Sequence, residues 1–151
     1  MAEVFPLIDA LLPHAHPMIL LDAVLGSDAE SLTTALTIRP DSRFAVVDEG
    51  VPAHVGIEYM AQTCGAFAGL EALRAGQPIR LGFLLGTRRF EASVAWFRAG
   101  WHLQVTVTVV FREGQMGVFD CRIRHEDNVV ATAQITVYQP DEASGGTIDQ
   151  D

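Results

Sequence analysis

The sequence contains no lysine, and all ten of its basic residues are arginines. Schiff-base chemistry, pyridoxal-phosphate attachment and a Walker phosphate loop each require an amine at a defined position, so these enzyme classes are excluded. Positive charge is also scarce overall, because 19 acidic residues outnumber the ten arginines and give a formal net charge of −9. Such a chain repels phosphate backbones, and nucleic-acid binding is therefore not expected.

Cysteine is rare, and no hydrophobic run is long. The two cysteines, Cys64 and Cys121, lie far apart within apolar patterns and match neither a CxxC pair nor a zinc-ligand spacing, so we interpret both as buried thiols. No apolar segment approaches the roughly 20 residues needed to span a bilayer. The N-terminus lacks the basic start and the small-residue cleavage site of a secretory signal, so the expected compartment is the cytoplasm.

Length and composition indicate one globular domain. With 151 residues, of which 49% are hydrophobic, the chain can bury an ample core but is short for two domains. We expect the domain to cover residues 1–138. Residues 139–151 are polar, acidic and rich in Gly and Ser, which is typical of a disordered tail.

The spacing of apolar residues predicts one long helix and several antiparallel strands. The helix, expected at 55–75, would be about 30 Å long and is apolar on nearly every side, so something must enclose it. Alternating apolar and polar residues predict strands long enough to do so. One antiparallel sheet curled around one central helix, an α+β architecture, is the economical solution. The other expected elements are a short helix at 3–12 and strands at 18–25, 31–38, 79–87, 101–111, 116–126 and 128–138.

Two polar residues stand out at the start of the predicted long helix. Glu58 lies in an otherwise apolar first turn, and Gln62 lies one turn later on the same face. The helix dipole alone favours an acid there, by about 0.3 to 1 kcal/mol, which is one explanation for Glu58. Catalysis is the other. No Ser, Thr, Asp or Asn directly precedes Val55 to cap the helix, and free N–H groups beside a carboxylate could hold a substrate carbonyl.

The histidines are the other candidates for acid–base chemistry. His14 and His16 lie among prolines just before an apolar run, and either could be a base or simply form a hydrogen bond at a strand entrance. Their spacing does not choose between them. His54 lies at the helix start, His102 on the polar face of its strand and His125 beside a turn, and the sequence identifies no partner for these three.

Arg88 and Arg89 form the only adjacent pair of basic residues in the chain. They can be explained as part of a solvated turn between strands. They can also be explained as a docking spot for an acidic partner, because clustered positive charge steers such a partner towards its site. The sequence leaves both explanations open.

Two segments resemble the 3-hydroxyacyl-acyl carrier protein dehydratases of fatty-acid synthesis, which have the hotdog fold. LPHAHPMILLDAV is similar to their LPHRYPFLLVDRV-type segment, and VPAHVGIEYMAQ resembles their helix start, MPGVLIIEAMAQ. The resemblance is closer still to a divergent branch associated with aryl polyene and similar specialised acyl pathways. The PAWVGIELMAQ and GFLLGSRRY segments of that branch are similar to PAHVGIEYMAQ and GFLLGTRRF here.

The resemblance implies roles for several residues. His14 falls on the family's catalytic histidine, Glu58 on its catalytic carboxylate and Ala53 on the glycine whose backbone N–H polarises the thioester carbonyl. Gln62 would orient Glu58 or the departing water, and Tyr59, which replaces a small residue, would narrow the acyl channel. The residues expected to bind the substrate are Ala53, His54, Val55, Gly56 and Gln62, and those expected to dock the carrier are Arg88 and Arg89.

The implied reaction removes water from a 3-hydroxyacyl thioester carried by an acyl carrier protein or coenzyme A. His14 would take the C2 proton, and Glu58, kept protonated by burial, would protonate the leaving hydroxyl. No metal or organic cofactor is needed. The resemblance also implies a homodimer, or a heterodimer with a paralogous hotdog subunit, in which His14 of one subunit meets Glu58 of the other.

Two alternatives remain at this stage. The chain could be a non-catalytic or half-active partner subunit, because SRFAVVDEGVPAHVG replaces the GHFPG stretch of the typical dehydratase. It could also be an acyl thioesterase, in which a carboxylate activates water and the histidine at the strand entrance is not required.

Overall fold

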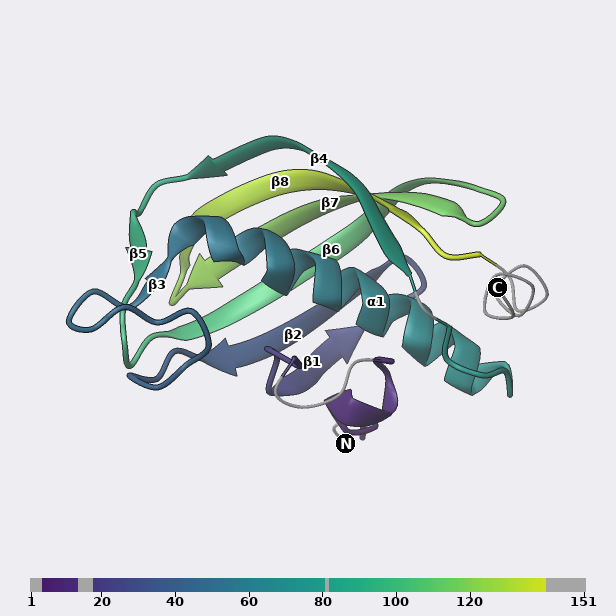
Figure 1. Ribbon diagram of the computed structural model, residues 1–151. Coiled ribbons are helices and arrows are strands. Elements are labelled where there is room, and N and C mark those ends of the chain that lie inside the picture. Colours follow the sequence, from purple (N-terminus) through teal and green to yellow (C-terminus); the bar gives the residue numbers. More distant parts are fainter. Residues whose placement is uncertain (1–3, 14–17, 81, 141–151) are drawn as a thin grey trace, which may run out of the picture.

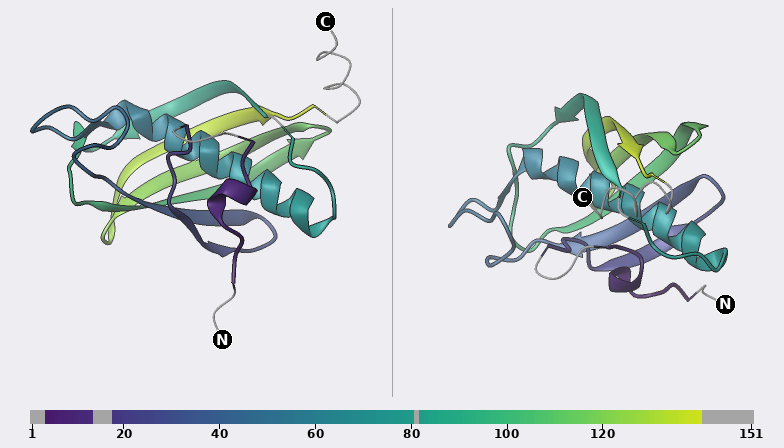
Figure 2. Two further views of the ribbon diagram at one scale, coloured as in Figure 1. Left: turned by 60° about the horizontal axis from the view of Figure 1, so that its bottom comes forward. Right: turned by 45° about the vertical axis from the view of Figure 1, so that its right-hand side comes forward.

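The computed structural model describes residues 4–13, 18–80 and 82–140. One sheet curls around one long helix, α1 (Gly56–Arg74), which lies across the concave side of the sheet (Figure 1). The predicted α+β architecture, in the form of the hotdog fold, is therefore present. Figure 2 shows from two further directions that the helix occupies the hollow of the sheet, and that no strand of the described residues covers the side of α1 that faces away from it.

The large sheet has six strands in the order β1-β2-β6-β7-β8-β4, and every neighbouring pair is antiparallel. β1 and β2 form a hairpin, β6 to β8 form a meander, and β4 returns to the edge beside β8. A separate two-stranded sheet pairs β3 with β5 near the start of α1. The strands are β1 (Ala23–Ser27), β2 (Ser31–Thr37), β3 (Val51–Pro52), β4 (Phe83–Ala92), β5 (Trp96–Phe97), β6 (His102–Glu113), β7 (Met116–His125) and β8 (Asn128–Tyr138).

The alternation of side chains along β6 explains how the sheet encloses the helix. Leu103, Val105 and Val107 are fully buried, whereas His102 and Gln104, which alternate with them, are exposed. Successive side chains of a strand point to opposite faces, so one face of β6 packs on α1 and the other meets solvent. Each buried aliphatic side chain of this size contributes about 1.5 to 3 kcal/mol to folding.

α1 is buried along most of its length because the sheet wraps around it. Met60 and Phe67 belong to the core, and the Phe67 ring packs edge-on against Phe119 of β7 with 5.6 Å between ring centroids. Polar groups also meet across this interface: the hydroxyls of Thr63 on α1 and Thr34 on β2 form a buried hydrogen bond of 2.9 Å. Polar groups on the covered side of the helix are thus paired rather than left unsatisfied.

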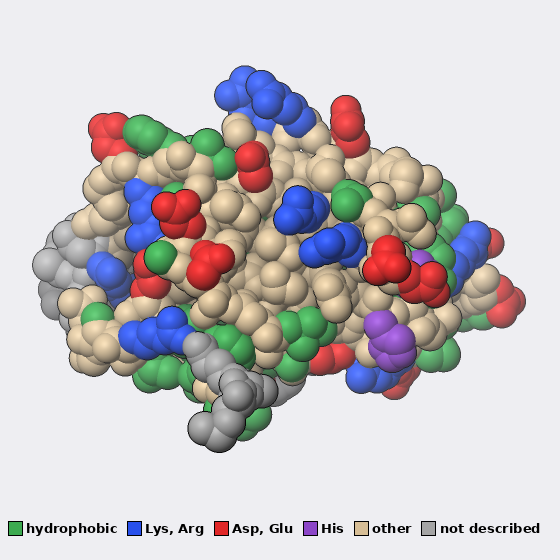
Figure 3. Space-filling model, turned by 180° about the vertical axis from the view of Figure 1, so that it is seen from behind, with side chains coloured by type: hydrophobic (Ala, Val, Ile, Leu, Met, Phe, Trp, Pro, Cys, Tyr) green, Lys and Arg blue, Asp and Glu red, His purple; other side chains and the backbone are tan. Residues whose placement is uncertain are grey.

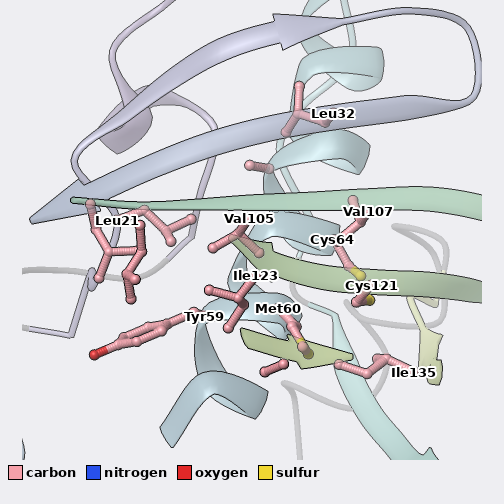
Figure 4. Packing of buried hydrophobic residues seen from close by; sticks show 14 of the residues in the cluster. Leu21, Leu32, Tyr59, Met60, Cys64, Val105, Val107, Cys121, Ile123 and Ile135 are labelled. Carbon is pink, nitrogen blue, oxygen red and sulfur yellow. The ribbon is translucent and has the colours of Figure 1, made fainter. Parts of the chain in front are cut away.

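Cys64 and Cys121 are both buried free thiols, which confirms the interpretation from the sequence. Figure 4 shows that Cys64 of α1 and Cys121 of β7 lie next to each other between helix and sheet. Burial raises the pKa of the Cys64 thiol well above its usual value, and the hydrogen bond with Cys121 raises it further. The thiol therefore stays protonated, and it is unsuited to act as a nucleophile.

The N-terminal segment differs from its prediction. The helix expected at 3–12 is reduced to a 3-10 turn, η1 (Ile8–Ala10), because the residues that follow leave the helical path and pack on α1. Leu11 and Leu12 are buried there, and the backbone of Leu11 lies against Gly69 of α1. The strand expected at 18–25 begins only at Ala23.

Arg88 and Arg89 lie within β4, so the explanation that places them in a turn is wrong. Arg89 has a φ of 56° and lies in an irregularity of the pairing between β4 and β8. A residue in this left-handed conformation marks a β-bulge, which inserts an extra residue into one strand and redirects the side chains around it. The bulge, rather than a turn, interrupts the alternation at this position.

β8 ends at Tyr138, and Gln139 donates its backbone N–H to the carbonyl oxygen of Gln115 at 2.9 Å. Most of the predicted tail, residues 141–151, lies outside the described residues. Within the described part of the chain, no helix has the length and apolar character needed to cross a membrane.

Candidate active site

The first turn of α1 lacks a side-chain cap. A 3-10 turn, η2 (Ala53–Val55), leads directly into α1, and neither element has a side-chain hydrogen bond at its N-terminus. The prediction of an uncapped helix start is confirmed. Because backbone N–H groups point out of a helix N-terminus, this end of α1 stabilises negative charge nearby.

The backbone N–H of Ala53 is already bonded: it lies 3.0 Å from the carbonyl oxygen of Ala95. The small sheet causes this contact, because the pairing of Pro52 with Trp96 brings the two backbones side by side. Ala53 itself adopts the helical conformation of η2, in which alanine is as acceptable as glycine. A thioester carbonyl would therefore have to displace Ala95 before it could use this donor.

Glu58 lies on the flank of α1 that the sheet leaves open. It is exposed, and it lines a pocket of about 220 Å³ between α1, the N-terminal segment and the start of β4. The burial expected for this carboxylate is therefore not provided by the described residues of a single chain. The reason lies in the topology, since strands cover only one side of the helix.

Small and apolar side chains make most of the rest of this pocket, and Gln62, Arg80 and Gln139 are its other polar members. Ala61, Gly65 and Ala68 recur every three or four positions, so they form a floor along one face of α1. Phe83 and Leu84 of β4 form a wall. A second hollow of about 180 Å³ shares several of the lining residues, including Ala68, and extends the groove along the helix. An extended apolar chain can lie in this groove with one end beside Glu58.

Gln62 binds the backbone of the segment that follows the histidines. Its side-chain oxygen Oε1 accepts a hydrogen bond from the Leu20 N–H at 2.9 Å, and its Nε2 donates to the Met18 carbonyl oxygen at 2.7 Å. Gln62 is buried, and both ends of its amide group are engaged. Its position differs from the expectation that it orients Glu58 or water. It holds the chain leading from His14–Pro17 against the helix instead.

Replacing Gln62 by Met is expected to lower the free energy of unfolding by about 1 to 3 kcal/mol, because it leaves the Leu20 N–H and the Met18 carbonyl without partners. Chemical denaturation measures this change. The matched control is Gln104→Met, which alters an exposed glutamine on β6 and should change stability by less than about 0.5 kcal/mol. Equal effects of the two substitutions would contradict the role of Gln62 as a clamp.

His14 and His16 lie outside the described residues, but the residues on either side of them are placed. Pro13 lines the pocket that contains Glu58. Met18, on the other side, is bound to Gln62 one helical turn from Glu58. The described parts of the chain therefore approach the Glu58 pocket from both directions.

Tyr59 does not narrow the groove beside Glu58, and that expectation is wrong. Its side chain is 2% exposed and packs against Phe97 with 6.0 Å between ring centroids. Residues adjacent in a helix project in different directions, which is why Tyr59 enters the core while Glu58 lines the open flank. Burial raises the pKa of the Tyr59 hydroxyl well above its usual value, so it stays protonated.

The other residues expected near the substrate are less informative. His54 is exposed, whereas Val55 and Gly56 are buried. Gly56 is needed for packing, because a Cβ there would crowd the Ile123 side chain at 2.9 Å. Val55 and Gly56 thus seat the start of the helix on the sheet.

The two histidines outside this region have structural partners that the sequence did not identify. His102 Nδ1 and Thr37 Oγ1 form a hydrogen bond of 2.9 Å between neighbouring strands. The His125 ring stacks on Trp101 with 3.9 Å between centroids. Neither contact lies at the Glu58 pocket, so these histidines support the sheet.

The profile of a known family matches nearly the whole chain. It is described as ApeP-like, ApeP dehydratase, and it covers residues 6–147. The chain belongs to the ApeP-like dehydratase family. None of the curated proteins matches it in sequence.

Similarity to solved structures agrees with this family. The chain is similar to the dehydratase heterocomplex ApeI:P from Xenorhabdus doucetiae, with 26% identity, a TM-score of 0.89 and coverage of 98% of this chain and 100% of the other. The E. coli PaaI protein of the phenylacetic acid degradation operon has 14% identity and a TM-score of 0.58, covering 77% and 81% of the two chains. A hypothetical thioesterase from Streptococcus pneumoniae, solved with coenzyme A, has 13% identity and a TM-score of 0.59, covering 79% and 94%. The last two share the hotdog fold alone.

The described residues offer no group of three or more His, Cys, Asp or Glu side chains that could hold a metal ion. Phe83 and Leu84 line the open groove, and their single positions in the sequence did not predict this role. Both residues belong to the GFLLGTRRF segment, which is part of the family resemblance. The resemblance gave a role to the two arginines of this segment but none to its apolar residues. The pocket thus places the Glu58 carboxylate among mostly apolar side chains, with Arg80 as the basic residue of its lining.

Proposed function

We propose that the chain is a subunit of a 3-hydroxyacyl thioester dehydratase that acts in the cytoplasm on intermediates bound to an acyl carrier protein. The observation that supports this most is Glu58, the carboxylate of a mostly apolar groove beside an uncapped helix start. A proton donor, an apolar chain site and a positive helix end are what elimination of water from such a substrate requires.

In the proposed reaction, neutral His14 removes the C2 proton of the 3-hydroxyacyl thioester. Electron density moves onto the thioester carbonyl, which the N-terminus of α1 stabilises. Glu58, in its protonated form, donates a proton to the 3-hydroxyl group as the C3–O bond breaks. The products are a 2-enoyl thioester and water, and a proton returned from His14 to Glu58 through solvent restores the starting state.

A second subunit is part of the proposal, because the groove is open on one side. β4 is an edge strand of the large sheet, and its side chains Phe83, Leu84 and Leu85 are 46%, 42% and 58% exposed. An exposed apolar edge strand invites pairing with another chain. A partner placed there would cover Phe83 and Leu84, close the groove and bury Glu58 away from water, which favours its protonated form.

The partner-subunit alternative also has an observation in its favour. The similar dehydratase from Xenorhabdus is a heterocomplex, and in the described residues Glu58 stays exposed without a partner. In that form of the proposal, this chain supplies half of a site and becomes active only with a paralogous hotdog subunit. The thioesterase alternative has only the fold likeness to support it.

Association tests these possibilities. Light scattering at micromolar concentration is expected to give at least twice the 16.4 kDa chain mass, either for the chain alone or after mixing with a paralogous hotdog subunit. Activity is then measured with a 3-hydroxyacyl thioester before and after mixing. Release of free thiol without formation of the enoyl product would identify a thioesterase. A monomer that gains neither mass nor activity on mixing would contradict the dehydratase proposal in both forms.

A further inference from the structure

The outer face of the large sheet carries four arginines: Arg88 and Arg89 on β4, and Arg122 and Arg124 on β7. Figure 3 shows basic side chains over the middle and the upper edge of this face. We refer to these four residues as the arginine patch. None of them forms an ion pair with a carboxylate of the described residues. By contrast, Arg39, Arg98 and Arg112 each pair with a carboxylate.

Strand register places the arginine patch on one face. Arg122 lies opposite Thr132, and Arg88 lies opposite Gln134, two residues further along β8. Residues opposite one another in antiparallel strands point to the same side of the sheet, as do residues two positions apart in one strand. The bulge at Arg89 turns this side chain to the same face, where it lines a hollow together with Arg122.

The hollow between Arg89 and Arg122 has a volume of about 270 Å³, and most of the residues that line it have polar or charged side chains. Thr106, Thr108 and Thr132 are among its lining residues, and the Thr106 hydroxyl forms a hydrogen bond of 2.8 Å with that of Thr33. Asp120 also lies there, and its carboxylate accepts a hydrogen bond of 3.3 Å from Gln134 Nε2. The surface is therefore positive but not uniformly so, because carboxylates lie among the arginines.

The charge of the patch is opposite to that of the chain. At a net charge of −9, long-range forces repel acidic partners, so binding one requires a local surface of unpaired positive groups. Guanidinium groups suit this role, because each can bind a carboxylate through two parallel hydrogen bonds. Asp120, and Glu91 opposite Thr132, would repel a uniformly anionic surface such as a lipid bilayer. A folded acidic protein, by contrast, can place its carboxylates on the arginines and away from Asp120 and Glu91.

We propose that the arginine patch docks the acyl carrier protein that delivers the substrate, and that Arg122 and Arg124 extend the surface beyond Arg88 and Arg89. This inference rests on the proposed function. β4 connects the two sites: Leu84 lines the Glu58 groove, and Arg88 and Arg89 follow about 13 to 17 Å further along the same strand, at about 3.3 Å per residue. Docking on the patch would thus bring the carrier to the edge strand that borders the groove.

The test compares a 3-hydroxyacyl carrier protein with a short free 3-hydroxyacyl thioester as substrates of the assembled enzyme. The variant Arg122→Gln with Arg124→Gln is expected to raise KM for the carrier-bound substrate about tenfold at low salt, the size expected for two charge contacts near the surface. KM for the free thioester should not change. Arg88→Glu with Arg89→Glu should act in the same direction. The difference should shrink in high salt, because screening weakens exposed charge pairs.

The matched control is Arg39→Gln with Arg98→Gln, which removes the same charge from exposed arginines outside the patch and should leave KM for both substrates unchanged. Binding of the carrier itself, measured by calorimetry, gives a readout that does not depend on turnover.

If the enzyme turns over the free thioester but neither KM nor carrier affinity responds to the patch variants, docking at the patch is wrong and the proposed function stands. If no thioester is turned over while carrier binding still depends on the patch, the proposed function fails and the docking surface remains. Patch-dependent binding to phosphatidylglycerol vesicles, without carrier binding, would overturn the inference in favour of a membrane surface.

Discussion

Replacing Glu58 by Gln is expected to reduce the formation of enoyl thioester by about 10² to 10⁴-fold, the usual contribution of a positioned acid or base. Glutamine keeps the size of the side chain but cannot donate the proton that the leaving hydroxyl requires. His14→Ala should cause a loss of the same order, and His16→Ala a much smaller one. Initial rates with the assembled enzyme and a 3-hydroxyacyl thioester measure all three.

The double variant Glu58→Gln with His14→Ala should be scarcely slower than the poorer single variant, because groups that act as a unit are not additive. Thermal melts accompany the kinetics, since a change in stability could also lower the rate. Full activity of Glu58→Gln would refute the assignment of the acid. If His16→Ala is inactive while His14→Ala is not, the assignment of the two histidines must be exchanged.

Gly69→Ala is expected to destabilise the chain by about 1 to 3 kcal/mol, the range for an overpacked core position. A Cβ at Gly69 would overlap the backbone carbonyl of Leu11, which cannot turn aside as a side chain can. Alanine gains up to about 1 kcal/mol of helix propensity over glycine, so the clash outweighs the gain. Because Leu11 precedes Pro13 at the Glu58 pocket, activity should fall as well.

Gly65→Ala provides the matched control, one turn earlier on the same helix. Its nearest contact is the tip of the Leu12 side chain at 3.2 Å, which can move. This variant should be neutral or more stable by up to about 1 kcal/mol. Denaturant melts of the two variants decide the matter: if they melt alike, the N-terminal segment is not held through Leu11.

The elements that were predicted well are those in which apolar residues recur with a regular spacing over many positions. Strands β6, β7 and β8 alternate over 10 to 12 residues, and the long helix expected at 55–75 is observed as Gly56–Arg74. The prediction of a short N-terminal helix was wrong, because an apolar face over ten residues does not show what that face packs against. There, contact with Gly69 determines the path of the chain.

In the candidate site, too, local features could be predicted and tertiary contacts could not. Glu58 could be identified because a carboxylate is conspicuous in an apolar helix, and the family resemblance gave it a role that remains a proposal. The clamp by Gln62 could not be foreseen, since its partners Met18 and Leu20 lie 44 and 42 residues away. The direction of Tyr59 and the bond between Ala53 and Ala95 likewise depend on tertiary contacts that no local pattern records.

The neighbouring thiols of Cys64 and Cys121 can be used to measure how often the helix separates from the sheet. Each thiol belongs to a different layer, one to the helix and one to the sheet, and both are closed off from solvent. An alkylating reagent reaches both thiols only after the packing around them opens, because at most 4% of either residue is exposed to solvent. The rate at which both become labelled therefore measures how often the helix lifts from the sheet, and slower labelling after addition of a partner subunit would record how far that partner suppresses the motion.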